Sequence, residues 1–390
     1  MRRIAILLAA IVAGVLVATG VGLAASSSGS QQQTSSNKEG PSVSVMTRNV
    51  YHGVNAELDD AARAPTQAQF FVEAAAVFNG YHQRKFPERA ALLAEEIRDT
   101  HPDVVGLQEA VMVRTDTPAD GPAPPATPAE QVSLDYLQIL LDALKERGLN
   151  YTAVVQSVNW DIEVPADENA DGRPDFDLRH TDRIAILIRT DQNSDLKVLG
   201  TNSGHFKPTS NCKLPTATGQ QIEIVRGWTS VDLSIRDKAV RVINTHLDGD
   251  CSDPAFQLAQ AQEILQGPVQ DARAKNLPVI LLGDLNSKAD GSGTATYANL
   301  LKVGFADAWA EAGRDPVTHP ELGYTCCQDA DLLNDVSHLS DRRDYVLFLS
   351  GPLQATDAEV VGAKPTDRTP SGLWPSDHAG VVADLRLLSK

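Results

Sequence analysis

The chain has 390 residues, of which 22% are charged, and its formal net charge is −17 at pH 7. This length suffices for one large or two small domains with a buried core. The acidic balance argues against a dedicated nucleic-acid-binding protein, which usually carries a basic stripe. It does not exclude a nuclease, because a bound metal ion and a few local cations can reverse the field in one cleft.

The N-terminus is typical of an export signal. Met1-Arg2-Arg3 is basic, the run 4–23 is apolar and uncharged, and a Ser/Gln-rich tract follows. We interpret residues 1–25 as a signal peptide or an uncleaved N-terminal membrane anchor, because the apolar run approaches the length that spans a bilayer. Residues 26–40 are predicted to be a disordered linker and 41–390 the folded domain. The protein is then secreted, or membrane-anchored and facing outside.

The folded part interleaves strand and helix signals. In chain order we predict a strand over 42–49, partly helical structure over 59–80, a helix over 87–100, a strand over 104–107, a loop over 115–128, a helix over 132–147, a strand over 184–188, a hairpin of strands 229–235 and 239–245, a helix over 254–266 and strands over 278–283, 345–349 and 380–385. The hairpin excludes a purely parallel sheet. We therefore predict an α/β fold with two mixed β-sheets packed face to face and helices outside.

The chain has four cysteines, all in the exported part, where disulfides are stable. The favoured pairing joins the adjacent Cys326 and Cys327 and leaves Cys212 with Cys251. The alternative is that the adjacent cysteines reach separate partners, since four cysteines permit three connectivities. The sequence has no C-x-x-C pair, so a thiolate zinc site is not expected.

Polar side chains stand at the ends of several apolar runs. Four short phrases carry them: Thr47-Arg48-Asn49, Leu107-Gln108-Glu109, Gly283-Asp284-Leu285-Asn286 and Ser376-Asp377-His378. A buried strand that delivers polar groups at its tip is how an α/β enzyme builds a site. Carboxylates, amides and an imidazole together suit hydrolysis of a phosphate ester with a divalent metal ion.

The last two phrases offer acid–base and metal-binding groups. After the turn that Gly283 permits, Asp284 and Asn286 point the same way if the backbone stays extended. They can then orient a water or a metal ion and donate an amide to a phosphate oxygen; the alternative is a simple Asp/Asn turn. Asp377 suits a hard metal such as Mg²⁺. His378 can act as a general base or stabilise negative charge, or it can be a surface residue in a turn.

Other strand ends carry matching groups. Asp344 heads a strand and can hold His378 in one tautomer and raise its pKa, or merely cap the strand. His246 ends a strand and can contact a phosphate, or merely satisfy a loop. Glu109 ends another strand, where a metal ion would offset the cost of burying its carboxylate, and Asn49 can support that metal.

Taken together, these phrases resemble the endonuclease/exonuclease/phosphatase superfamily, whose members include deoxyribonuclease I, exonuclease III and sphingomyelinases. The similar residues are, in order, Asn49, Glu109, His246, Gly283-Asp284-Leu285-Asn286, Arg342-Arg343-Asp344-Tyr345 and Ser376-Asp377-His378. The resemblance covers about residues 42–387. It implies a four-layer α/β sandwich, with 41–390 as the catalytic domain, and cleavage of P–O bonds with Mg²⁺, or with Mn²⁺ or Ca²⁺.

The resemblance also implies roles at the matching positions. Glu109 corresponds to the main metal ligand, and the implied metal site consists of Asn49, Glu109 and Asp377. Asp284 and Asn286 correspond to the pair that positions the water and the phosphate. His246 corresponds to the histidine that contacts the phosphate, and Asp344 and His378 correspond to an Asp–His dyad. The implied catalytic residues are His246, Asp284, Asn286, Asp344 and His378.

Two arginines are candidates for substrate phosphate binding. Arg343 stands where the family more often has an aliphatic residue, so it places an extra cation beside the dyad. Arg183 opens another strand and is a second candidate, with a rim pairing to Asp182 as the alternative. The longer Trp-Cys-Asp-Arg phrase of the inositol phosphatases is absent, which argues against that subgroup.

An acidic segment matches the start of a calcium-binding loop. Asp167, Asn169, Asp171 and Gly172 have the required spacing. Position twelve of the loop is Leu178 rather than Glu, so an ordinary EF-hand is excluded. A solvated acidic loop is the favoured alternative, and structural Ca²⁺ stays open for a protein outside the cell.

The sequence thus predicts an exported, divalent-metal-dependent hydrolase of a phosphodiester, either a nucleic acid or a phospholipid headgroup. A nuclease needs Lys and Arg beside the site, whereas a sphingomyelinase- or phospholipase C-like enzyme needs aromatic side chains at the rim. The aromatic candidates are Phe70, Phe71, Phe78, Tyr81 and Trp160, although the helical spacing of the first four suits the core equally well. A non-enzymatic binding module ranks last because no principal site residue is lost. We expect a monomer without a stable protein partner.

Overall fold

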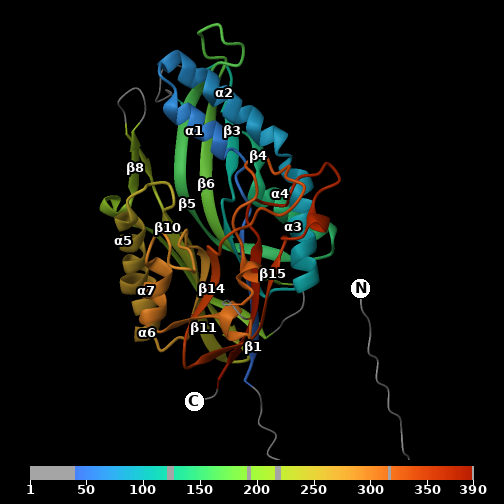
Figure 1. Ribbon diagram of the computed structural model, residues 1–390, viewed down its shortest axis with the longest axis vertical. Coiled ribbons are helices and arrows are strands. Elements are labelled where there is room, and N and C mark those ends of the chain that lie inside the picture. Colours follow the sequence, from blue (N-terminus) through green and yellow to red (C-terminus); the bar gives the residue numbers. More distant parts are fainter. Residues whose placement is uncertain (1–39, 121–126, 191–194, 216–220, 315–317, 389–390) are drawn as a thin grey trace, which may run out of the picture. The chain divides into compact units, whose positions relative to one another are not determined.

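Two mixed β-sheets lie face to face at the centre of the fold (Figure 1). The structure is a computed structural model that describes residues 40–388 except 121–126, 191–194, 216–220 and 315–317, all within one compact unit. The predicted signal or anchor (1–25) and the linker up to residue 39 lie outside the described residues. Along the described chain, no helix has the length and apolar character needed to cross a membrane.

The larger sheet contains eight strands, seven of which form one path while the eighth, β5 (Tyr151–Ala166), pairs with β6. The path runs through β15 (Leu353–Val361), β16 (Gly380–Leu387), β1 (Ser42–Asn49), β2 (Val104–Gln108), β6 (Phe176–Arg189), β3 (Met112–Asp116) and β4 (Gln131–Asp135). Strand β1 runs parallel to β2 and antiparallel to β16.

The smaller sheet contains six strands. Its order is β13 (Phe305–Asp307), β14 (Asp344–Leu349), β12 (Val279–Asp284), β11 (Lys238–His246), β10 (Gly227–Ile235) and β7 (Leu196–His205). Strand β12 runs parallel to β11 and antiparallel to β14. A separate two-stranded ribbon joins β8 (Cys212–Pro215) to β9 (Gln221–Ile224).

Helices cover the outer faces of both sheets (Figure 1). The larger sheet packs against α2 (Gln67–Gln83), α3 (Phe86–Thr100) and α4 (Tyr136–Glu146), with α1 (Asn55–Arg63) beside α2. The smaller sheet packs against α5 (Pro254–Ile264), α6 (Gln270–Ala274) and α7 (Thr296–Lys302), while the short α8 (Ala308–Glu311) contacts β14 and β15. The predicted four-layer α/β sandwich is confirmed.

Strand β12 shows why the sequence folds into these layers. Ile280 and Leu282 pack between the two sheets, whereas Val279 and Leu281 pack against the helices on the outer face. All four side chains are buried, because a strand covered on both faces places successive apolar residues in two different cores. Each such side chain stabilises the fold by roughly 1.5–3 kcal/mol. The strand therefore holds the residue at its carboxyl end in a fixed position.

Several element boundaries differ from the prediction. The helix predicted over 132–147 begins only at Tyr136, where Asp135 caps it by accepting from the backbone N–H of Gln138 over 3.2 Å. The residues before it form β4, because they pair with β3. The region 59–80 divides into α1 and α2. The predicted hairpin is confirmed as β10 and β11, which meet at a turn through Arg236 and Asp237.

Candidate active site

The predicted site residues meet at one edge of the two sheets. The parallel pairs β1–β2 and β11–β12 place their carboxyl ends side by side. Strands β14 and β16 run antiparallel to their neighbours, so they begin at this same edge. The residues that the edge gathers are Asn49, Glu109, His246, Asp284, Asn286, Asp344 and His378.

Asn49 connects the two halves of the site. Its Nδ2 donates to Oε1 of Glu109 over 2.9 Å and to Oδ2 of Asp284 over 3.1 Å, while its Oδ1 accepts from the backbone N–H of Tyr51 over 2.9 Å. These contacts direct the amide nitrogen at both carboxylates. Asn49 therefore lies directly beside Glu109, and its predicted part in supporting a metal ion stays a prediction. Its contribution is to hold two acidic side chains close together.

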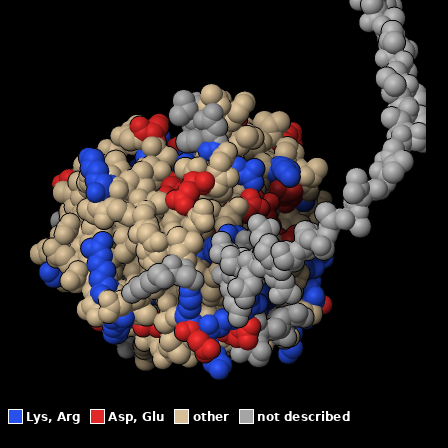
Figure 2. Space-filling model, turned by 90° about the horizontal axis from the view of Figure 1, so that it is seen from below, with Lys and Arg blue, Asp and Glu red and all other residues tan. Residues whose placement is uncertain are grey.

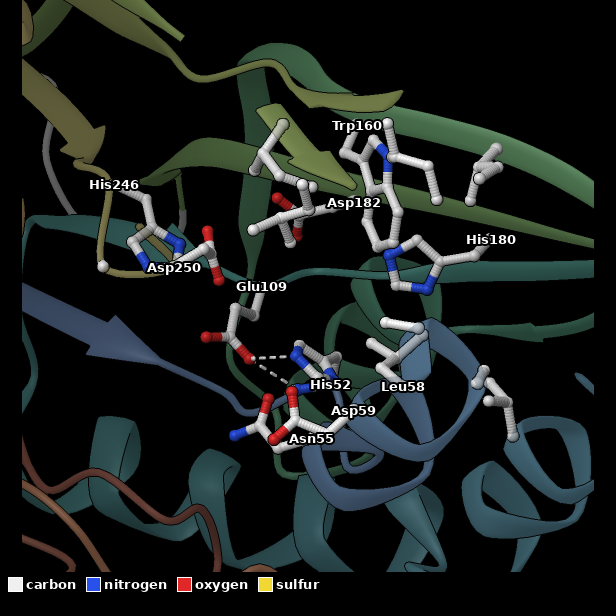
Figure 3. A pocket seen from close by; sticks show the side chains of 18 of the residues that line it. His52, Asn55, Leu58, Asp59, Glu109, Trp160, His180, Asp182, His246 and Asp250 are labelled. Carbon is white, nitrogen blue, oxygen red and sulfur yellow. Dashed lines mark hydrogen bonds and ion pairs between the residues drawn. The ribbon is translucent and has the colours of Figure 1, made fainter. Parts of the chain in front are cut away.

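Glu109 follows β2 with a φ of 58° and faces the pocket. Its Oε2 accepts from the backbone N–H of His52 over 2.8 Å, and Nε2 of the His52 ring lies 3.6 Å from the same oxygen (Figure 3). Burial alone would raise the pKa of Glu109, but the His52 imidazole, the Asn49 amide and the charged His378 hold that pKa below its usual range. The carboxylate is therefore ionised.

The donor set fits a divalent cation. Glu109, Asp284 and Asp377 all line one pocket and are all at most 9% exposed. Burial and the neighbouring Asp344 raise the pKa of Asp284 to about 7, and burial raises the pKa of Asp377 to about 6. A cation here would stabilise the charged forms of these acids. Carboxylate oxygens are the ligands that Mg²⁺, Mn²⁺ and Ca²⁺ prefer.

Asp344 and His378 form a buried pair. Nδ1 of His378 lies 2.8 Å from Oδ2 of Asp344, and Nε2 lies 3.7 Å from Oδ2 of Asp284. Burial lowers the pKa of His378, but the carboxylates of Asp344 and Asp284 raise it well above its ordinary value. The imidazole is therefore positively charged at neutral pH, with its Nε2–H directed toward the site.

His246 lies on the other side of Asp284. A guanidinium can only donate, so Nδ1 of His246 accepts from Nη1 of Arg226 over 2.9 Å, and the ring proton resides on Nε2. This nitrogen lies 3.5 Å from Oδ2 of Asp284 and 3.2 Å from Nδ2 of Asn286. Burial and the Arg226 charge hold the pKa of His246 well below its ordinary value. His246 is therefore a neutral hydrogen-bond donor.

Two buried arginines fix the chain around the catalytic edge. Nη1 of Arg89 donates to the backbone oxygens of Val50 and Pro375, over 2.8 Å and 2.9 Å, and so ties the segment after β1 to the one before β16. Arg48 donates to the backbone oxygen of His378 and pairs with Glu96 over 2.9 Å. These contacts hold the backbone of the segment that carries His378.

The two arginines predicted to bind phosphate differ in placement. Arg343 lines the pocket, although its Nε donates to Oδ1 of Asp341 over 2.7 Å. Arg183 is 5% exposed and donates to the backbone oxygen of Ala110 over 2.8 Å and to the carboxylate of Asp135. Arg183 is not among the lining residues of the described pocket, and its predicted phosphate contact stays a prediction.

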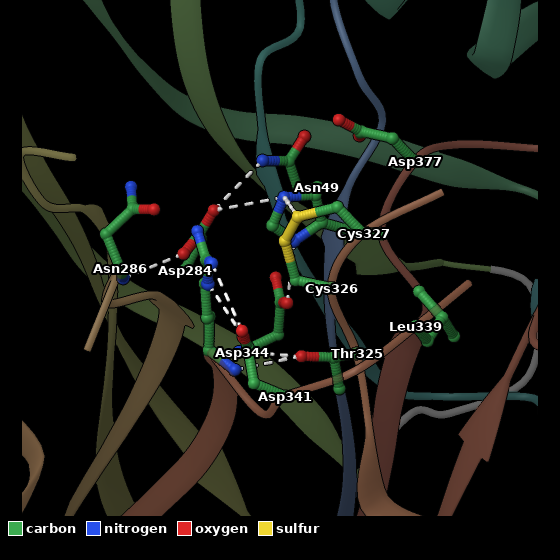
Figure 4. Close-up of a disulfide and its surroundings, with 12 residues drawn as sticks. Asn49, Asp284, Asn286, Thr325, Cys326, Cys327, Leu339, Asp341, Asp344 and Asp377 are labelled. Carbon is green, nitrogen blue, oxygen red and sulfur yellow. Dashed lines mark hydrogen bonds and ion pairs between the residues drawn. A yellow bond between two sulfur atoms is a disulfide. The ribbon is translucent and has the colours of Figure 1, made fainter. Parts of the chain in front are cut away.

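Both favoured disulfides are present: Cys212 is joined to Cys251, and Cys326 to Cys327. The adjacent pair lies beside the catalytic edge (Figure 4), where Sγ of Cys327 is 3.9 Å from Nε2 of His378. The alternative, in which the adjacent cysteines have separate partners, is not what the structure contains.

The pocket continues from the acidic groups into an apolar space, with a total volume of about 570 Å³. Phe70 and Trp160, two of the aromatic candidates, line it. Phe71 and Tyr81 are buried in the core, and Phe78 packs on Phe176 with ring centroids 5.1 Å apart. The other apolar side chains of the lining include Leu58, Val77, Ile162, Val164, Leu178 and Ile224.

The lining residues that the sequence analysis did not assign to the site include Arg226 and, as Figure 3 shows, His52, His180 and Asp182. Nη2 of Arg226 pairs with Asp250 over 2.8 Å, and Nη1 lies 3.8 Å from Asp182. His180 is buried against Trp160, and burial lowers its pKa to about 3. His180 and Asp182 lie inside β6, where polar residues within a strand pattern are a signal, whereas His52 and Arg226 lie outside the strands and no sequence pattern marks them.

The acids, imidazoles and amides at this edge are those of a phosphoesterase-type hydrolase built on a four-layer sandwich. The chain matches the sequence model of the Endonuclease/Exonuclease/phosphatase family over residues 49–378, and it belongs to this family. No curated protein matches the chain. Enzymes of this family hydrolyse phosphoester bonds and generally depend on a divalent metal ion.

Solved structures share the fold. An endonuclease/exonuclease/phosphatase family protein from Bacteroides thetaiotaomicron is 17% identical, with a TM-score of 0.52 over 89% of this chain and 95% of that one. An endonuclease/exonuclease/phosphatase from Bacteroides vulgatus is 16% identical, with a TM-score of 0.51 over 89% of this chain and 99% of the other. At these identities the likeness supports the architecture alone.

Proposed function

We propose that this protein is an exported, divalent-metal-dependent hydrolase of a phosphodiester. The observation that carries the proposal is the continuous set of contacts from Glu109 through Asn49, Asp284 and His378 to Asp344. It connects an ionised carboxylate to a charged imidazole through a buried aspartate. Export is supported by the basic and apolar N-terminus and by the two disulfides, which persist in oxidising compartments.

The side chains divide the chemical work. Asp284, with its pKa raised to about 7, accepts a proton from the attacking water. His378, kept charged by Asp344, donates its Nε2–H to the negative charge that builds on the phosphoryl group. A divalent ion held by Glu109, with Asp377 on the same pocket, would neutralise phosphate oxygens and ease departure of the leaving oxygen.

Neutral donors complete the site on the side of the smaller sheet. His246 presents Nε2–H, and Asn286 presents its side-chain amide, which also donates to the backbone oxygen of Leu247 over 3.0 Å. Arg226 fixes the His246 ring in this tautomer. Donors that are already oriented stabilise developing charge without reorganising during the reaction.

The pocket favours a phosphodiester with an apolar group, as in a sphingomyelinase- or phospholipase C-like enzyme, over a nucleic acid. Trp160 and Phe70 line the apolar part of the pocket. Its lining arginines are each paired with acidic residues: Arg63 with Asp59, Arg226 with Asp250, and Arg343 with Asp341. Figure 2 shows another face, seen from below in Figure 1 near the start of β1, and on its uncovered part Lys and Arg are scattered among Asp and Glu.

The test is a substrate panel of DNA, RNA, sphingomyelin, a short-chain phosphatidylcholine and a water-soluble aryl diester, with Mg²⁺, Mn²⁺, Ca²⁺ or EDTA. We expect metal-dependent hydrolysis of the aryl diester and of at least one lipid. The Glu109→Gln variant is expected to be inactive, and the matched control is Glu359→Gln, because Glu359 is exposed on β15. Hydrolysis that persists in EDTA would refute the metal proposal, and cleavage of nucleic acid alone would refute the lipid preference.

A further inference from the structure

We propose that the loop between β5 and β6, residues 167–175, is a calcium site separate from the catalytic pocket. The loop connects the two longest strands of the larger sheet, β5 and β6. Its sequence places acidic or amide side chains at positions one, three and five and glycine at position six, as oxygen-lined calcium loops require.

The loop already has the backbone path that such a site needs. Oδ2 of Asp167 accepts from the N–H of Gly172 over 2.8 Å, and Oδ1 of Asn169 accepts from the N–H of Asp171 over 2.9 Å. Gly172 has a φ of 87°, a conformation that side chains with a Cβ rarely adopt. Oδ1 of Asp171 accepts in turn from the N–H of Arg173 over 2.9 Å. Alternate side chains therefore turn back into the loop.

A second, independent observation points to a cation. Asp167 is only 1% exposed, and its Oδ1 is buried with no hydrogen-bond partner among the described residues. The other oxygen of this carboxylate bonds to Gly172, so the group is directed into the loop. An unpartnered buried carboxylate oxygen is costly unless a cation or a donor satisfies it. A calcium ion bound within the loop would satisfy it directly.

The remaining ligands come from the loop itself. Position seven is Arg173, which can supply a backbone oxygen, and position nine is Asp175. Asp175 accepts from the backbone N–H of Glu168 over 2.8 Å, which places its carboxylate near the start of the loop. Position twelve is Leu178, which is buried in the core, so the usual bidentate Glu is missing. We therefore expect weak affinity, with a Kd of roughly 10⁻⁴–10⁻³ M, typical of extracellular calcium modules.

Binding here would stabilise one wall of the substrate pocket. The backbone N–H of Asp167 donates to the backbone oxygen of Phe71 over 3.0 Å and so docks the hairpin on α2. Strands β5 and β6 carry Trp160, Ile162 and His180, which line the pocket. Calcium would thus order the hairpin that borders the apolar part of the pocket, without contributing to catalysis.

The experiment measures calcium binding under conditions that minimise binding of Ca²⁺ at the catalytic site. Glu109→Gln protein is titrated with Ca²⁺ in saturating Mg²⁺, by isothermal calorimetry and by thermal unfolding. Each of the substitutions Asp167→Asn and Asp171→Asn is introduced separately into this Glu109→Gln protein, and Asp290→Asn is the matched control. Asp290 accepts from the backbone N–H of Ser292 over 2.8 Å in an exposed turn of the same kind.

We expect one calcium-binding event and a higher Tm in the background protein and in the Asp290→Asn control. Asp167→Asn and Asp171→Asn are expected to weaken the affinity by about tenfold or more, because each removes a charged ligand. Asp171 is exposed, so we expect Asp171→Asn to fold, and it tests the calcium proposal even if Asp167→Asn does not fold. Equal calcium affinity in the Asp171→Asn protein and the control, or no calcium binding in the background protein, would overturn the proposal. Neither result would affect the proposed phosphodiesterase activity.

Discussion

Replacing Asp344 by Asn tests the charged state of His378. The substitution keeps the size of the side chain but removes the negative charge 2.8 Å from Nδ1 of the imidazole. Both residues are buried, at 1% and 6% exposure, so water cannot replace the lost charge. If Asp344 keeps His378 protonated, the variant must lose proton affinity at this ring.

The size of the effect follows from the strength of a charged hydrogen bond. Such a bond is worth about 1.5–3 kcal/mol, and one pKa unit corresponds to about 1.4 kcal/mol. We therefore expect the pKa of His378 to fall by about one to two units. The sign follows from the direction of the shift: the raised pKa keeps the active, protonated form present until pH rises through that pKa. In the variant, the loss of activity with rising pH must therefore begin at a lower pH than in the wild type.

The assay is the pH profile of kcat on a soluble aryl diester with saturating Mg²⁺. At pH values above the wild-type pKa of His378 we expect kcat to fall by about 10- to 100-fold, because the alkaline limb is displaced downward by about one to two units. Asp329→Asn is the matched control, because Asp329 contacts Nδ1 of His338 over 2.7 Å at an exposed position. An Asp344→Asn profile that keeps the wild-type alkaline limb would show that His378 does not act as a charged donor.

Further predictions concern the metal, the pocket and the core. Glu109→Gln is expected to remove metal-dependent hydrolysis while leaving the unfolding midpoint in urea, measured without metal, close to that of the wild type. Trp160→Ala is expected to raise KM about tenfold for a short-chain phospholipid and to leave KM for a small water-soluble diester unchanged, because the substitution removes a large apolar ring from the pocket lining. Leu282→Ala is expected to lower the free energy of unfolding by about 2–5 kcal/mol in urea titration, since Leu282 is fully buried between the sheets.

The architecture could be predicted because its signals are local. Alternating apolar residues in β10 and β11 and the continuous apolar run of β12 each indicate a strand without tertiary information. The start of α4 could not be placed, because the residues of β4 have side chains of intermediate or high exposure and are held by pairing with β3. Pairing with a distant strand leaves little trace in a short, half-exposed segment.

In the candidate site, too, the residues marked by local signals could be predicted and those that depend on distant partners could not. Residues at the tips of apolar strands, such as Asp284 and His246, could be predicted because strand ends converge at one edge. The roles of Arg226 and His52 could not, because each depends on a partner that only the fold brings near. Asn49 was assigned to the correct place, but the direction of its amide is set by the Tyr51 backbone and could not be foreseen.

The charge around the pocket makes a final prediction about substrate binding. Glu109, Asp284 and Asp377 face the space where an anionic phosphoryl group would lie. The nearby cations are already engaged, because Arg226 pairs with Asp250 and Arg343 with Asp341. Without a divalent cation, a phosphate group would therefore meet net repulsion from the carboxylates.

Inorganic phosphate is the simplest probe of this repulsion. We expect its affinity, measured by calorimetry, to rise at least about tenfold when Mg²⁺ is added, since neutralising even one adjacent charge is worth more than 1.4 kcal/mol in a buried site. The same addition is expected to have little effect on Glu109→Gln protein. Equal phosphate affinity with and without Mg²⁺ in the wild type would mean that the charge of His378 and the hydrogen bond from His246 suffice to hold phosphate beside the three carboxylates. The divalent ion would then have no part in holding the substrate.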